Sequence, residues 1–229
     1  MSITLFELAG KNPERRFSPY CWRTLFALHH KGLAFDRDII RFCDKSAISF
    51  CDSKTVPVIK DGDNAVADSF EIARYLDKTY PDLPELLGGS VGEGQAKFIE
   101  NWVNSQILPA IFRMIILDIY EGLADTDKEY FRETREKRFN LPLEKVFKYD
   151  DEQKATLHKA LTPLRNMLDS QPFICGQAPA YSDYILMGCF MFARSSSNKT
   201  ILDPNDPVHK WLDPMLNLYD GLGLNIQQC

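Results

Sequence analysis

Residues 18–21 read Ser18-Pro19-Tyr20-Cys21, between a strand-like apolar run and an amphipathic segment. Serine is a favoured N-cap and proline suits the first helical position, so this stretch predicts a helix that begins just after Ser18. A dithiol oxidoreductase would carry cysteine in place of this serine. The serine removes intramolecular disulfide chemistry, while the helix start, with its partial positive charge, still favours a thiolate. The stretch therefore indicates a site for the sulfur of another molecule.

Outward from Ser18, the first eighty residues alternate strand-like and helical patterns. Gly32 is expected to end the first helix, Asp61-Gly62-Asp63-Asn64 predicts a hairpin, and Tyr80-Pro81 ends the closing helix. The order βαβαββα predicts a small sheet covered by helices. The expected elements are strand Ile3–Leu8, helix Pro19–Lys31, strand Phe35–Ile40, a weak helical or irregular stretch Asp44–Asp52, strands Val56–Ile59 and Ala65–Ala67, and helix Ser69–Thr79.

Residues 82–92 are rich in glycine and proline and predict a linker between two domains, residues 1–81 and 93–229. After the linker, apolar spacing indicates helices and no convincing strand pair. Pro109 lies inside the first of these helices and is expected to kink or divide it. The fold class is therefore α/β followed by an all-α helical bundle. The expected helices are Glu93–Tyr120, Asp127–Arg138, Glu152–Asp169, Asp183–Arg194 and His209–Gly221.

Composition excludes several classes of function. The net charge of −5 and pI near 5.4 argue against a nucleic-acid partner. The N-terminus lacks a secretory signal pattern, and the apolar run Ile107–Ile119 is too short to span a bilayer, so we expect a cytoplasmic protein without a membrane partner. The cysteines show no metal-ligand spacing, so we expect no metal and reduced thiols. They are Cys21, Cys43, Cys51, Cys175, Cys189 and Cys229.

Two further motifs complete a candidate site. Val56-Pro57 fits the start of a strand, and its position is like that of the cis-proline of thioredoxin-like domains, where the preceding residue offers its backbone to an extended peptide. Asp68-Ser69-Phe70-Glu71 resembles a capping box, so it is either a plain helix start or a place where Ser69 and backbone N–H groups bind a carboxylate. Together with Ser18, these motifs describe a cradle for a short thiol peptide.

Ser18 itself allows two interpretations. It either only caps the helix or also donates a hydrogen bond to a bound thiolate, and the surrounding motifs favour the second. Cys21 lies one turn further on. A buried helix residue is a simpler expectation for it than a redox thiol.

With these motifs, the chain resembles the cytosolic glutathione transferases: a thioredoxin-like βαβαββα domain followed by a helical domain. The resemblance implies that Val56, next to a cis Pro57, pairs with the cysteinyl backbone of the cosubstrate glutathione. It also implies that Asp68 and Ser69 bind the γ-glutamyl end, that Ser18 activates the sulfur, and that the protein is a homodimer. Tyrosine-type members carry a hydroxyl where this chain has Phe6, which supports Ser18.

More narrowly, Ser18–Thr24, Ala27–Gly32 and Trp211–Asp213 look like the bacterial lignin β-aryl-etherase branch and its fungal relatives. In one departure, Ala180 stands where the family usually has a serine or threonine cap. The expected cost is about 1 kcal/mol unless Ser182 or Asp183 replaces the cap.

The resemblance implies an electrophile pocket above Ser18, against the first long helix of the helical domain. Apolar and aromatic side chains there suit an aryl compound, and a charged arginine among them needs a partner or a ligand. The expected reaction is attack of the glutathione thiolate on an aromatic or hydrophobic electrophile, with β-aryl ether cleavage as the first candidate. Dehalogenation, general conjugation, a non-catalytic glutathione or ligand carrier, and a thiol oxidoreductase are the alternatives. The expected pocket residues are Phe112, Arg113, Ile116 and Tyr120.

Overall fold

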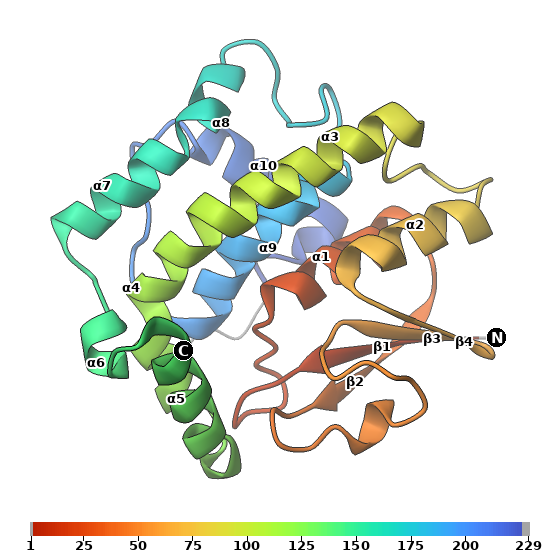
Figure 1. The fold of residues 1–229 in the computed structure, drawn as a ribbon. Helices are drawn as coiled ribbons and strands as arrows, with labels where there is room; N and C mark the ends of the chain where they lie inside the picture. Colours follow the sequence, from red (N-terminus) through yellow and green to blue (C-terminus); the bar gives the residue numbers. More distant parts are fainter. Residues whose placement is uncertain (1, 226–229) are drawn as a thin grey trace.

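A four-stranded mixed sheet forms the base of the N-terminal half (Figure 1). The computed structural model describes residues 2–225, and Cys229, counted above among the reduced thiols, lies outside them. The strand order is β2-β1-β3-β4, with β1 parallel to β2 and antiparallel to β3, and with β3 antiparallel to β4. The predicted βαβαββα order is confirmed. The strands are β1 (Ile3–Leu8), β2 (Phe35–Ile40), β3 (Val58–Asp61) and β4 (Asn64–Ala67).

Two helices, α1 (Pro19–His30) and α2 (Ser69–Thr79), cover the face of the sheet that is turned toward the helical half (Figure 1). Leu25 and Phe26 of α1 are fully buried. Gly32 follows the helix with a φ of +65°, as its predicted role in ending the helix requires. Between β2 and β3 the weak helical stretch is only a 3₁₀ turn, η1 (Ser46–Ile48).

The C-terminal half is helical, as expected, and α9 packs against α1, α3 and α4 at its centre (Figure 1). Residues 80–88 connect α2 to α3, which begins at Gly89 rather than at Glu93. The division into domains 1–81 and 93–229 stays a prediction. The helices are α3 (Gly89–Trp102), α4 (Leu108–Glu121), α5 (Asp125–Phe139), α6 (Leu143–Val146), α7 (Asp151–Ala160), α8 (Thr162–Met167), α9 (Tyr181–Ser196) and α10 (His209–Gly221).

Pro109 interrupts the first long helix, though without breaking it. A π-helical turn, η2 (Val103–Ile107), joins α3 to α4 immediately before it. Proline has no N–H to continue the ladder, and a π turn is a common way to absorb such a local change. Gly89–Glu121 is the one helical stretch in the described part of the chain whose length and apolar content would suit a membrane span. Here Met114 and Ile115 are fully buried in the core of the fold.

Asp183 supplies one half of a capping box at the start of α9. Its carboxylate accepts a hydrogen bond from the Ala180 N–H (3.2 Å), but the alanine still offers no side-chain acceptor to the first-turn N–H groups, so the compensation for the missing cap stays a prediction. It also accepts from the backbone N–H groups of Ile174 (2.8 Å) and Cys175 (3.1 Å), and from Nε1 of Trp211 (2.8 Å). The side chain of Asp183 is completely buried. One carboxylate thus fixes the loop before α9, the start of α9, and α10.

A chain of hydrogen bonds links α1 to α9 and to the end of α10. His30 Nδ1 lies 2.7 Å from the hydroxyl of Tyr184, which lies 2.7 Å from the hydroxyl of Tyr219. His30 Nε2 lies 3.1 Å from the carbonyl oxygen of Glu85. Burial lowers the pKa of His30 and so favours the neutral ring, which can make both contacts by donating from Nε2 and accepting at Nδ1.

Candidate active site

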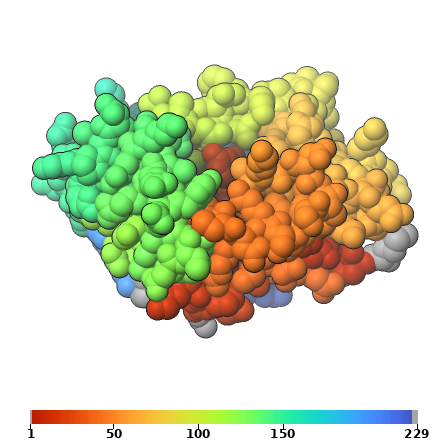
Figure 2. All heavy atoms as spheres, turned by 60° about the horizontal axis from the view of Figure 1, so that its bottom comes forward, coloured from red at the N-terminus to blue at the C-terminus, as the bar shows by residue number. Residues whose placement is uncertain are grey.

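A cavity of about 700 Å³ lies between the two halves of the chain, and Ser18 lines it. Figure 2 shows a hollow between the orange segment of the N-terminal half and the green helices, with red atoms of the N-terminal segment inside it. Phe112 and Phe192 line the cavity from the helical half. One wall therefore carries the predicted thiol site, and the other contributes aromatic rings.

Ser18 occupies the N-cap of α1, as its sequence context predicts. Its backbone is extended (φ −62°, ψ 125°), and Pro19 is the first helical residue. Its Oγ accepts a hydrogen bond from the Cys21 N–H at 3.4 Å, and the residue is only 6% exposed. The hydroxyl still has a proton to donate, and the helix N-terminus supplies positive potential beside it. These features suit a bound anion at Ser18.

Cys21 is a buried helix residue, in agreement with the simpler expectation. It is 1% exposed. Burial raises the pKa of its thiol to about 12, with the nearby Glu7 carboxylate acting in the same direction. A thiol in this environment stays protonated at neutral pH, so it is a poor nucleophile.

Val56 and Pro57 stand on the cavity wall, and the peptide bond between them is cis, as the resemblance implies. Among the described residues, no hydrogen bond engages the N–H or the carbonyl group of Val56. The carbonyl of Pro57, in contrast, accepts from the Asp68 N–H at 3.2 Å. Val56 therefore offers an available backbone edge that an extended peptide can pair with.

Asp68 and Ser69 begin α2 at the same cavity. One Asp68 carboxylate oxygen accepts from the N–H groups of Phe70 (2.8 Å) and Glu71 (3.2 Å), which confirms the aspartate cap. The second half of the predicted capping box is wrong, because the carboxylate of Glu71 pairs with Arg74 at 2.6 Å and the Asp68 N–H is already bonded. The side-chain oxygen of Ser69 is buried and has no partner within residues 2–225. A buried hydroxyl without a partner on a cavity wall indicates a ligand contact.

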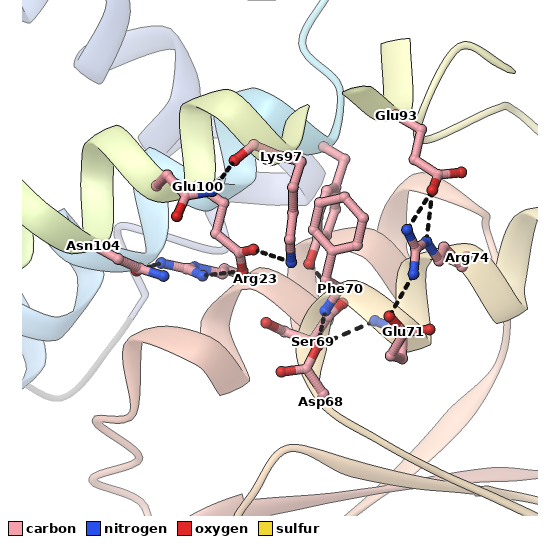
Figure 3. A network of polar contacts seen from close by, with 12 residues as sticks. Arg23, Asp68, Ser69, Phe70, Glu71, Arg74, Glu93, Lys97, Glu100 and Asn104 are labelled. Carbon is pink, nitrogen blue, oxygen red and sulfur yellow. Dashed lines mark hydrogen bonds and ion pairs between the residues drawn. The ribbon is translucent and has the colours of Figure 1, made fainter. Parts of the chain in front are cut away.

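A polar network that the sequence motifs do not predict adjoins this helix start (Figure 3). Lys97 Nζ pairs with Glu100 at 2.7 Å and lies 4.3 Å from the centroid of the Phe70 ring. Arg23, fully buried, pairs with Glu100 at 3.3 Å and donates to Asn104 at 2.9 Å. Lys97 and Glu100 line the cavity, so an ammonium and a carboxylate stand together near Ser69. Their spacing of three residues on one helix is the only sequence signal for the pair.

The aromatic wall comes from three helices. The ring centroid of Phe112 (α4) lies 5.8 Å from that of Phe139 (α5) and 6.4 Å from that of Phe192 (α9), with interplanar angles of 19° and 14°. All three side chains line the cavity. Phe112 is thus on the wall as predicted, whereas Phe139 and Phe192 are not predicted, because they lie on other helices whose packing against α4 no local sequence pattern sets.

The other three predicted pocket residues do not line the cavity. Ile116 is completely buried among the helices. Arg113 lies against Phe139, with 5.4 Å from its guanidinium to the ring centroid, and Tyr120 packs beside Arg132 at 4.7 Å. The face of α4 on the cavity repeats at helical spacing, as Leu108, Phe112 and Ile119. Helical phase explains Arg113 and Tyr120, because each follows one of these residues by one position and therefore points about 100° away around the helix. Ile116 shares the face of Phe112 and Ile119, but neighbouring side chains cover it completely.

The fold is that of a glutathione S-transferase, a thioredoxin-like domain followed by an all-helical domain. A family model described as "Glutathione S-transferase, C-terminal domain" matches residues 95–215, more than half of the chain. A second, "Glutathione S-transferase, N-terminal domain", matches residues 17–79. The chain belongs to the glutathione S-transferase family.

Relatives by sequence include the glutathione S-transferase-like protein ustS of Aspergillus flavus. The two are 33% identical over an alignment of 137 positions, which covers 54% of this chain and 48% of that protein. Glutathione S-transferase U13 of Arabidopsis thaliana is 26% identical over an alignment of 102 positions, which covers 41% of this chain and 44% of that protein. The matches thus span about half the length of these curated relatives.

Solved structures share the fold across nearly the whole chain. Glutathione transferase GSTFuA3 from Phanerochaete chrysosporium has a TM-score of 0.79 at 23% identity, covering 96% of this chain and 92% of that one. The glutathione S-transferase CsGST83044 of Ceriporiopsis subvermispora, solved in complex with glutathione, has a TM-score of 0.76 at 22% identity, covering 97% and 95%. At these identities the likeness shows the fold alone.

Proposed function

We propose that this protein is a glutathione transferase that adds the sulfur of glutathione to a hydrophobic or aromatic electrophile. The observation that carries the proposal is the contrast between the hydroxyl of Ser18 and the thiol of Cys21 at the start of α1. Ser18 has its hydroxyl at a helix N-terminus on the cavity wall, whereas the thiol of Cys21 is buried and protonated. The reactive sulfur therefore comes from a ligand, which argues against an oxidoreductase that uses Cys21.

The cradle fits glutathione group by group. The available backbone edge at Val56 suits the cysteinyl unit, and Asp68 and Ser69 suit the γ-glutamyl unit, since the Ser69 hydroxyl has no partner within residues 2–225. Beyond Val56, Lys45 and Lys54 line the same cavity and supply positive charge for the glycyl carboxylate. Each recognition group is thus a polar atom that the fold leaves available.

In the proposed reaction, Ser18 donates its hydroxyl proton in a hydrogen bond to the glutathione thiolate. The sulfur then attacks the electrophilic carbon, a carbon–sulfur bond forms, and the bond to the leaving group breaks with its electron pair. The proton that the thiol lost balances the charge of the leaving group. Ser18 stabilises the thiolate and forms no covalent bond, which is why a serine without a histidine base suffices.

Among the possible reactions, cleavage of a β-aryl ether is the first candidate, because the Ser-Pro-Tyr-Cys helix start resembles that of the etherase branch. Phe112, Phe139 and Phe192 add a stacked aromatic wall suited to an aryl group. Mass spectrometry of products from a panel of aryl ethers, benzyl halides and activated aryl halides tests this choice. A released phenol together with a glutathione conjugate supports ether cleavage, whereas conjugates from the halides alone favour the dehalogenating or conjugating alternative.

The central test replaces Ser18 by alanine. A hydrogen bond to a charged acceptor contributes about 1.5–3 kcal/mol, so the pKa of bound glutathione should rise by roughly one to two units. We expect kcat/KM at pH 6.5 to fall about 10- to 100-fold, with glutathione affinity changed less than about threefold. Ultraviolet difference titration of bound glutathione measures the thiol pKa directly. An unchanged pKa and unchanged turnover would remove Ser18 from the mechanism.

Two control variants make this test specific. Ser69→Ala should weaken glutathione binding without moving the thiol pKa, because Ser69 is assigned to the γ-glutamyl end. Cys21→Ala should keep full turnover, since the Cys21 thiol is buried. If bound glutathione in the unmodified protein keeps the pKa of free thiol and no electrophile is consumed, the protein is a passive carrier instead.

We also propose a homodimer that works in the cytoplasm. Val91 and Phe98, seven residues apart on α3, are each 73% exposed and form an apolar surface suited to a second copy. The cysteines described here are free, in keeping with a reducing compartment. Analytical ultracentrifugation should show a dimer, and Phe98→Glu should shift it to monomer.

A further inference from the structure

We propose that the electrophile is an aromatic carboxylate, and that Arg135 and Arg138 of α5 bind its carboxylate group. The inference rests on the proposed transferase function and specifies its substrate class.

The two arginines share the face of α5 that lines the cavity. They are three residues apart, so they lie on the same side of the helix. The Arg135 guanidinium lies 4.5 Å from the Phe131 ring centroid and 4.9 Å from that of Phe42. The Arg138 guanidinium lies 5.8 Å from the Phe139 centroid. Two guanidinium groups are thus held against aromatic rings at one edge of the cavity.

Neither Arg135 nor Arg138 has an anionic partner among residues 2–225. Arg135 donates one hydrogen bond, to the neutral hydroxyl of Thr134 at 2.8 Å. Arg132, on the same helix, pairs instead with Glu136 and Glu144, both at 2.9 Å. Two carboxylates therefore neutralise Arg132, which lies outside the cavity. Arg135 and Arg138, which line the cavity, have no counter-ion among residues 2–225.

The surroundings make an anion favourable there. Half-burial among rings lowers the pKa of Arg135, and the charge of Arg138 acts in the same direction. A partly desolvated cation next to a like charge is destabilised until an anion binds to it. A carboxylate matches the planar fork of a guanidinium with two parallel hydrogen bonds.

The charge balance of the cavity supports a second anion beyond glutathione. Within residues 2–225, two carboxylates stand on the wall: Asp68, which caps α2, and Glu100, which is paired with Arg23 and Lys97. The chain as a whole carries a net charge of −5, yet its cavity is strongly cationic. The cations on the wall are Arg41, Lys45, Lys54, Lys97, Arg135 and Arg138.

Glutathione, as placed above, binds through its glycyl carboxylate to Lys45 and Lys54. Arg135 and Arg138 belong to α5 instead, the helix that also supplies Phe139 to the aromatic wall. An aryl ring on Phe112 and Phe139 would bring a ring carboxylate toward the two arginines. The electrophilic carbon would then face the sulfur at Ser18. The chemistry of transfer is unchanged: the carbon–sulfur bond forms as the leaving group departs with its electron pair, and the arginines exchange no electrons.

A binding test does not depend on turnover. We would titrate the protein with S-benzylglutathione and with S-(3-carboxybenzyl)- and S-(4-carboxybenzyl)glutathione, which differ only in the carboxylate. At least one carboxylated ligand should bind about tenfold more tightly than S-benzylglutathione, as a bidentate charged pair implies. The double variant Arg135→Gln/Arg138→Gln should lose this advantage while still binding S-benzylglutathione.

Three further variants separate recognition from folding. Arg138→Gln changes an exposed residue, so it should fold and lose part of the advantage by itself. Arg135→Lys keeps the charge without the fork and should retain part of it. Arg132→Gln is the matched control on the same helix, and it should leave all three affinities unchanged.

The outcomes are distinct. If no carboxylated ligand binds more tightly than S-benzylglutathione, or if the advantage survives in the double variant, the inference is overturned. Transferase turnover is measured separately, with benzyl bromide and 4-(bromomethyl)benzoate. No turnover of either compound, and none of the aryl ethers in the product panel, would refute the transferase function, while tight carboxylate binding lost in the double variant would still support the arginine site.

Discussion

Asp183→Asn tests the view that one buried carboxylate holds the helical half together. One oxygen, Oδ1, accepts from the Ile174 N–H and from Nε1 of Trp211, and the other, Oδ2, accepts from the Cys175 and Ala180 N–H groups. An asparagine has only one carbonyl oxygen. Whichever way its amide turns, its NH₂ group faces two N–H donors that can no longer be satisfied.

The structure sets the size of the loss. Two hydrogen bonds to a charged acceptor disappear, at about 1.5–3 kcal/mol each, so the free energy of unfolding should fall by roughly 3–6 kcal/mol. The free energy of unfolding of a typical protein is only about 5–15 kcal/mol. The fold should therefore remain but unfold at a much lower urea concentration. Asp213→Asn is the matched control, because the Asp213 side chain is 65% exposed and should change stability by less than about 0.5 kcal/mol.

Urea unfolding should be followed by circular dichroism for helix content and by tryptophan fluorescence for packing. Coincident curves allow the free energy to be compared between variants. A loss below about 1 kcal/mol for Asp183→Asn would refute the reasoning, because two unsatisfied buried donors cannot cost so little. The same small loss for both variants would mean that the burial of Asp183 contributes nothing.

Other predictions concern the corrected pocket and the link between the halves. Ile116→Ala should lower stability by about 2–5 kcal/mol and leave the KM for the electrophile unchanged, because Ile116 is a core residue. Phe112→Ala should raise that KM, and equal effects of the two substitutions in steady-state kinetics would contradict the assignment. Burial lowers the pKa of His30 below its ordinary value of about 6.5, so the unfolded chain binds more protons just below that pH. Stability should therefore fall as the pH drops below 6.5, and His30→Gln should flatten this slope in urea unfolding measured at several pH values; an equally steep slope in the variant would rule His30 out.

Much of the fold follows from local patterns. The strands Ile3–Leu8 and Phe35–Ile40 and the helix Ser69–Thr79 have the predicted bounds, since alternation, turns and caps are encoded within a few residues. The short helix Leu143–Val146 was missed, because four residues show no helical period. The expected helix Glu152–Asp169 is divided at Leu161, just before Pro163, where the proline removes a ladder hydrogen bond.

The two walls of the cavity differ in how far the sequence predicts them. Ser18, Val56 and Ser69 lie at a helix start, just before a strand and at another helix start, and each of these is a feature of three or four adjacent residues. The structure brings all three to one cavity. Their roles toward glutathione remain predictions. Their common location could be predicted from the sequence, because a thioredoxin-like topology places these backbone features at one edge of its sheet.

The electrophile wall is different in kind. It combines side chains from α4, α5 and α9, and whether a residue such as Phe112 or its neighbour Arg113 faces the cavity depends on the rotation of its helix about its own axis. No local pattern on one helix sets that rotation, because it is fixed by packing against the others. The same separation has a consequence for function: substitutions on the cavity face of α5, such as those at Arg135 and Arg138, can change the accepted electrophile without disturbing the helix starts that hold the thiolate. Substrate class should therefore vary with α5 while Ser18 keeps its role.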